Sequence, residues 1–161
     1  MISYEQLEDK HQEVFLDIAC FFISAEGTYP VIMWKDCGYF PTIAIRVLSQ
    51  RSLIKIRDGN RFWMHNQVRD FGRYIVLQVY SRKFCGLWIS EDALKLLEGK
   101  KRNEDAEALS LTSDGCNHSI ASEELAALPN LRFLRVKGID LFGNVENLLF
   151  ESKMVFLGNY A

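Results

Sequence analysis

The octapeptide Phe15-Leu16-Asp17-Ile18-Ala19-Cys20-Phe21-Phe22 is the most informative part of this sequence. Seven of its eight residues are apolar, and they continue a helical stripe that broadens until its last turn is apolar nearly all round. This pattern predicts a helix from Leu7 to Ile23 whose end is deeply buried. Asp17, the one acid in the stretch, is then expected to be a buried polar residue with a hydrogen-bond partner rather than a general base.

Two more helices are predicted directly after this stretch. Gly27 interrupts the first pattern, and residues 29–37 form an apolar helical pattern that stops at Gly38. A third helix begins at Pro41, because proline is favoured in the first turn of a helix. It extends to about Ser52.

The apolar period then changes to that of a β-hairpin. Residues 53–56 alternate in part, Asp58-Gly59 is a strong turn signal, and residues 62–64 supply the partner strand. A further amphipathic helix runs from about Asn66 to Tyr80. Three helices, a hairpin and another helix predict a winged-helix domain over residues 1–80, mainly α with a small β-wing.

The next segment, residues 81–105, is expected to be a connector with one short helix. Ser90 is placed to cap that helix, and Gly99 ends it. The run Lys100-Lys101-Arg102 follows the helix end, where cations complement the helix dipole. We therefore interpret this run as a solvated surface rather than a binding patch.

A repeat begins after the connector. Three segments share one L-x-x-L-x-L-like frame, starting 25 and then 23 residues apart: Ala106-x-x-Leu109-x-Leu111, Leu131-x-x-Leu134-x-Val136 and Met154-x-x-Leu157. This spacing is typical of leucine-rich repeats, in which each frame is one strand of a horseshoe. Residues 123–128 are expected to supply a convex-side helix. Residues 106–161 therefore predict the incomplete start of an α/β leucine-rich-repeat solenoid, in a chain that we expect to be truncated.

Composition limits the classes of partner. Lys and Arg number 19 against 21 Asp and Glu, so the formal net charge is −2 and no basic surface indicates nucleic-acid binding. The N-terminus has no signal-peptide pattern, and no apolar run approaches the roughly 20 residues of a membrane span. The sequence predicts a protein of the cytoplasm, or of the nucleus, that binds neither nucleic acid nor membrane.

Neither a metal site nor a catalytic site is expected. The four cysteines, at positions 20, 37, 85 and 116, are scattered without a C-x-x-C pair, which favours reduced and mostly buried thiols. His11, His65 and His118 fall in a polar helix start, the wing junction and a loop, so no nucleophile and base converge. The chain also lacks a G-x-x-x-x-G-K-[ST] loop. It should not hydrolyse ATP by itself.

Four motifs resemble, in order and spacing, the ARC2 winged-helix domain of plant immune receptors with an N-terminal TIR domain, nucleotide-binding domain and leucine-rich repeats. They are Phe15 to Phe22, Cys37-Gly38-Tyr39, Leu48-x-x-Arg51-Ser52-Leu53-Ile54 and Met64-His65-Asn66. The resemblance implies a role in disease resistance and defence signalling. It also implies ADP or ATP as the cofactor of the full-length receptor, with none bound by this chain in isolation. Its partners would be the nucleotide-binding and leucine-rich-repeat domains of the same protein, other receptors or pathogen effectors.

The same resemblance assigns one cofactor contact. In this family the Met-His-Asp motif closes the nucleotide pocket, and its histidine, here His65, donates a hydrogen bond to the β-phosphate of ADP. Asn66 departs from the family aspartate; it keeps an oxygen that can cap the following helix but loses the charge of the latch. The alternative for His65 is that it only satisfies a backbone group at the end of the wing.

Two other functions compete with this interpretation. A DNA-binding winged helix would read bases with residues 41–52, but this helix has only Arg46 and Arg51 among many apolar residues. We therefore expect this helix to pack against neighbouring domains. The second alternative is a stand-alone truncated module that binds a full-length receptor.

Overall fold

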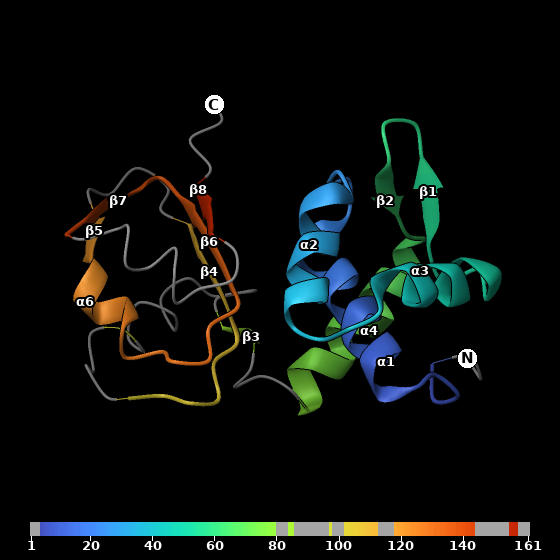
Figure 1. Ribbon diagram of the computed structural model, residues 1–161, viewed down its shortest axis with the longest axis horizontal. Coiled ribbons are helices and arrows are strands. Elements are labelled where there is room, and N and C mark those ends of the chain that lie inside the picture. Colours follow the sequence, from blue (N-terminus) through green and yellow to red (C-terminus); the bar gives the residue numbers. More distant parts are fainter. Residues whose placement is uncertain are drawn as a thin grey trace. The chain divides into compact units, whose positions relative to one another are not determined.

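A computed structural model describes residues 4–79, 84–85, 97, 102–112, 118–143 and 155–157. The chain forms two compact units, Met1–Val79 and Tyr80–Ala161 (Figure 1). Apart from Leu97, which is helical and buried, the predicted connector helix at Ser90 to Gly99 lies outside the described residues, as does most of the basic run that follows it.

The informative octapeptide spans two kinds of helix. Helix α1 (Asp9–Asp17) continues directly into a π-helical turn, η1 (Ile18–Phe22). Every residue from 15 to 22 is buried, with at most 5% of any of them exposed. The predicted deep burial of this helix end is therefore confirmed, while the change from α to π pitch was not predicted.

Asp17 is satisfied inside the core. Helix α2 (Thr28–Asp36) brings in Trp34, whose indole Nε1–H donates to Asp17 Oδ2 over 2.8 Å. Both side chains are fully buried. Trp34 also packs edge-on against Phe22, with ring centroids 5.8 Å apart. The expectation that Asp17 is a buried, hydrogen-bonded residue is confirmed.

Helix α3 (Pro41–Gln50) starts at the predicted proline and leads into the wing. The wing is an antiparallel hairpin of β1 (Lys55–Arg57) and β2 (Arg61–Trp63), which projects beyond the helices in Figure 1. Gly59 and Asn60 in its turn have positive φ, of 75° and 56°. The strands lie one to two residues from their predicted places, because Leu53 and Ile54 are buried below the hairpin instead of pairing in it.

Residues 24–27 form a third, irregular segment of the wing, which pairs with the outer edge of β2. The Ser24 amide donates to the Phe62 carbonyl over 2.8 Å, and the Phe62 amide donates to the Ala25 carbonyl over 3.2 Å. Sequence analysis missed this pairing because the segment has neither apolar alternation nor β-branched residues.

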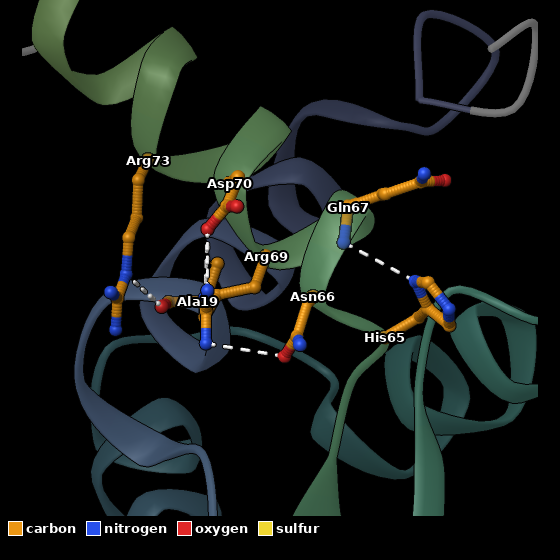
Figure 2. A network of polar contacts seen from close by, with 7 residues as sticks. All are labelled: Ala19, His65, Asn66, Gln67, Arg69, Asp70 and Arg73. Carbon is orange, nitrogen blue, oxygen red and sulfur yellow. Dashed lines mark hydrogen bonds and ion pairs between the residues drawn. The ribbon is translucent and has the colours of Figure 1, made fainter.

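Helix α4 (Asn66–Val79) lies close against η1. A Cβ atom at Gly72 would lie only 2.8 Å from the Cβ of Ala19, so the absence of a side chain permits this approach. Arg73 reinforces it, because its Nε–H donates to the Ala19 carbonyl over 3.0 Å (Figure 2).

The second unit contains parallel strands. One sheet has the order β3 (Phe84–Cys85), β4 (Ala108–Thr112), β6 (Phe133–Lys137) and β8 (Val155–Leu157). A second ladder pairs β5 (His118–Ala121) with β7 (Ile139–Phe142). Between them in sequence, α6 (Ser122–Leu125) is shorter than the helix predicted at 123–128. His118 thus begins a strand and is not in a loop.

The core of this unit uses the predicted apolar frame. Its buried residues include Leu109, Leu111, Leu134 and Val136. Leu109 pairs with Leu134, which is the predicted offset of 25 residues. The predicted third frame is wrong by two residues, since Leu157 pairs with Val136 and not with Leu134. A shift by two keeps the same side chains on the same face, so the apolar pattern could not distinguish the two registers.

Candidate functional site

The candidate site lies where β2 of the wing meets the first turn of α4. Met64 is buried and anchors the junction, whereas His65 and Asn66 are both exposed. The side chains therefore sit at a helix N-terminus, where backbone N–H groups have no partner within the helix and the helix dipole favours negative charge.

One ring nitrogen of His65 already has a hydrogen-bond partner. Nδ1 accepts a hydrogen bond from the Gln67 backbone amide over 3.2 Å, so His65 caps helix α4 (Figure 2). Trp63 lies edge-on to the imidazole, with ring centroids 6.3 Å apart and planes at 90°. Because Nδ1 is the acceptor, the neutral ring carries its proton on Nε2. His65 can thus offer the N–H of its other ring nitrogen to a ligand.

The prediction that Asn66 caps α4 is wrong. Asn66 is the first residue of the helix, and its Oδ1 accepts a hydrogen bond from Arg69 Nη1 over 3.3 Å (Figure 2). Arg69 also forms an ion pair with Asp70 over 2.8 Å. His65 takes the capping position because its ring nitrogen reaches the amide two residues on. Figure 2 shows the two side chains on different contacts, so they do not act as one polar pair.

Two cations surround Trp63 on the wing, and sequence analysis did not single them out. Arg57 lies over the indole with its Cζ 4.3 Å from the ring centroid, and the Lys55 Nζ is 5.3 Å away. Lys55 pairs directly with Trp63 across the hairpin. Alternation along the two strands could have revealed this shared face, since residues at even separation lie on one side of a sheet.

The remaining titratable groups offer no reactive centre among the described residues. Within that part of the chain no three His, Cys, Asp or Glu side chains are placed to hold a metal ion. Cys20 and Cys37 are free thiols. Burial, followed by the charge of Asp17, raises the pKa of Cys20 to about 12, while Arg73 opposes the shift. Cys20 is therefore a poor nucleophile.

No helix in the described parts of the chain is long and apolar enough to cross a bilayer.

Several known proteins are similar to this chain in sequence. Residues 8–80 match the family of Roq1-like disease resistance proteins, winged-helix domain. The chain is 38% identical over 107 residues to disease resistance protein RRS1B of Arabidopsis thaliana, which covers 65% of this chain and 8% of that protein. It is 31% identical over 136 residues to TMV resistance protein N of Nicotiana glutinosa, a match that covers 84% of this chain and 12% of that protein. Disease resistance protein RUN1 of Vitis rotundifolia is 30% identical over 142 residues, a match that covers 84% of this chain and 10% of that protein.

The order of helices and hairpin defines the N-terminal unit as a winged-helix domain. Its sequence match places that domain, over residues 8–80, in the Roq1-like family of plant disease resistance proteins. The chain spans about a tenth of the length of the curated relatives it matches.

Proposed function

We propose that this chain is a regulatory part of an immune receptor of the plant cytoplasm or nucleus. Its winged-helix domain would close the nucleotide site of a neighbouring nucleotide-binding module and hold ADP there. The membership of residues 8–80 in a disease resistance family supports this role. ADP would bind only with that module present, because this chain supplies a single wall of the site.

The contact at Nδ1 of His65 is the observation that carries the proposal. Once Nδ1 accepts the Gln67 amide, the proton of the neutral ring lies on Nε2, and the His65 side chain as a whole is exposed. The positive end of α4 lies beside it. A phosphate oxygen of ADP would accept the Nε2–H hydrogen bond. Capping of the helix and binding of the phosphate therefore use different nitrogens, so the two roles of His65 are compatible.

With asparagine instead of aspartate at position 66, the electrostatic contribution to the proposed closure of the nucleotide site is weaker. A carboxylate at this position would face Arg69, whereas the amide oxygen meets the same guanidinium without a formal charge. We propose that His65 contributes the nucleotide contact and that Asn66 only orders the first turn of α4.

The test joins this chain to the nucleotide-binding module of a relative such as RRS1B and measures ADP release. His65→Ala should speed release at least about tenfold, since one charge-assisted hydrogen bond contributes roughly 1.5–3 kcal/mol. Gln67→Ala is the matched control, because it keeps the backbone amide that His65 accepts. Equal release rates in all three proteins would remove His65 from the site.

We further propose that the second unit begins a leucine-rich-repeat domain. Its support is the parallel pairing of β4 and β6 at an offset of 25 residues, over a core of Leu and Val side chains. Such a unit stacks on further repeats, which add to one continuous core. Its partners would be effectors or other receptors.

A further inference from the structure

The outer edge of the wing presents unused backbone groups. The amide and carbonyl of Phe62 in β2 bond to Ala25 and Ser24, and thus point away from β1. Phe62 pairs with Ile56 of β1. In an antiparallel ladder such a pair turns all four of its backbone groups outward. The N–H and C=O of Ile56 therefore face away from β2, on an edge that pairs with no other strand among the described residues.

Two cations flank these backbone groups. Lys55 and Arg57 are exposed and lie on the face that carries Trp63, which holds both of them through its ring. Neither has a carboxylate within ion-pair distance in the described parts of the chain. The side chain of Ile56, 43% exposed, lies on the opposite face. Along this edge, charge and apolar surface therefore alternate.

The distribution of charge favours a short acidic ligand. Residues 46–79 contain seven Lys and Arg against two Asp and Glu, whereas residues 1–45 contain two against seven. A long polyanion such as a nucleic acid needs an extended basic surface, and the Trp63 ring is already engaged by cations instead of being free to stack on a base. An extended protein segment requires only the edge of one strand.

We propose that the outer edge of β1 binds an extended acidic segment of a partner protein, which joins the wing as an added strand. Its backbone would pair with the N–H and C=O of Ile56. Acidic side chains would lie opposite Lys55 and Arg57, and an apolar residue between them would meet the Ile56 side chain. The recognised pattern is thus acid, apolar residue, acid. This interaction does not depend on His65 or on ADP.

The test measures fluorescence anisotropy of two labelled peptides with the full chain. One alternates Glu and Val, and the other has the same composition with Glu and Val in separate blocks. The alternating peptide should bind at least about tenfold more tightly. Lys55→Glu with Arg57→Glu should reduce its affinity at least about tenfold, while Arg46→Glu, a charge reversal on α3, should leave it unchanged.

Ile56→Pro separates strand addition from simple charge attraction. Proline removes the outward N–H but no hydrogen bond of the β1–β2 ladder, so the hairpin should survive and peptide binding should be lost. Circular dichroism melting checks the fold of each variant; if the double Glu variant does not fold, Lys55→Gln with Arg57→Gln replaces it, with the same expected loss.

Three results would overturn the proposal. They are equal affinity for the two peptides, unchanged binding by Ile56→Pro, and no binding of the alternating peptide. Duplex DNA that binds through Lys55 and Arg57 while the peptide does not would assign these cations to nucleic acid instead.

Discussion

The environment of Cys20 makes the stability of the folded state depend on pH. Its folded-state pKa of about 12 lies above the ordinary value of 9.0, so the folded state keeps a proton that the unfolded chain loses. This contribution to stability is complete below pH 9 and is lost as the pH rises toward 12.

We therefore predict a steeper fall in unfolding free energy above pH 9 in the native chain than in Cys20→Ala. The difference in slope should reach about 1.4 kcal/mol per pH unit. Urea denaturation at several pH values measures it. Cys37→Ala is the control, since Cys37 is only half-buried. Parallel curves for the native chain and Cys20→Ala would contradict the buried protonated thiol.

The charge missing at Asn66 can be restored by substitution. Asn66→Asp places a carboxylate in the first turn of α4 and three residues before Arg69. The helix dipole and the added ion pair should raise the unfolding free energy by roughly 0.5–1 kcal/mol. Urea denaturation of this chain provides the measurement, and the gain should shrink in 1 M salt, about the concentration at which screening is nearly complete. A salt-independent change would argue against an electrostatic origin.

Helix α4 approaches η1 closely at Gly72. Gly→Ala in a helix ordinarily stabilises by about 1 kcal/mol. Gly72 should behave in the opposite way, because its new methyl group would meet Ala19 at 2.8 Å and overpacking costs roughly 1–3 kcal/mol.

Gly72→Ala is therefore predicted to lower the melting temperature. Adding Ala19→Gly should recover part of the loss, which a double-mutant cycle quantifies. A stabilised Gly72→Ala protein would show that the two elements are not in close contact.

The burial of η1 can be tested by placing a charged side chain in it. Phe21 is 5% exposed, so Phe21→Asp buries an unpaired carboxylate at a cost of several kcal/mol and should unfold the N-terminal unit. Tyr29→Asp, at a position 57% exposed, is the control and should leave the far-ultraviolet circular dichroism spectrum native. Native melting of Phe21→Asp would refute the burial of η1.

Local sequence signals predicted the elements of this unit well where caps, glycines and apolar periodicity agreed. The buried octapeptide, Pro41 and the Asp58-Gly59 turn are examples. Features that depend on residues distant in sequence were missed. The pairing of residues 24–27 with β2 and the two-residue shift of β8 both arise from tertiary packing, which single-sequence periodicity does not encode.

The candidate site was predicted only in part, for the same reason. His65 was found through a motif, but its capping contact required the geometry of the strand-to-helix junction. That geometry assigned the cap to His65 and not to Asn66. The cluster of Lys55 and Arg57 around Trp63 needed the hairpin register, which local patterns fixed only to within one or two residues.

The chain as a whole joins a winged-helix domain to a unit of parallel strands. The sequence contains no G-x-x-x-x-G-K-[ST] motif, so the proposed switch depends on a nucleotide held by another module. Under the proposed function, the wing junction would contact that nucleotide through the His65 side chain.

The most direct measurement is therefore the ¹⁵N NMR spectrum of the His65 ring, in the chain joined to a nucleotide-binding module, with and without ADP. We expect Nδ1 to remain the acceptor from Gln67 with and without ADP, and ADP to shift the Nε2 resonance. A proton on Nδ1 of the neutral ring, or an Nε2 resonance that ADP leaves unchanged, would contradict it.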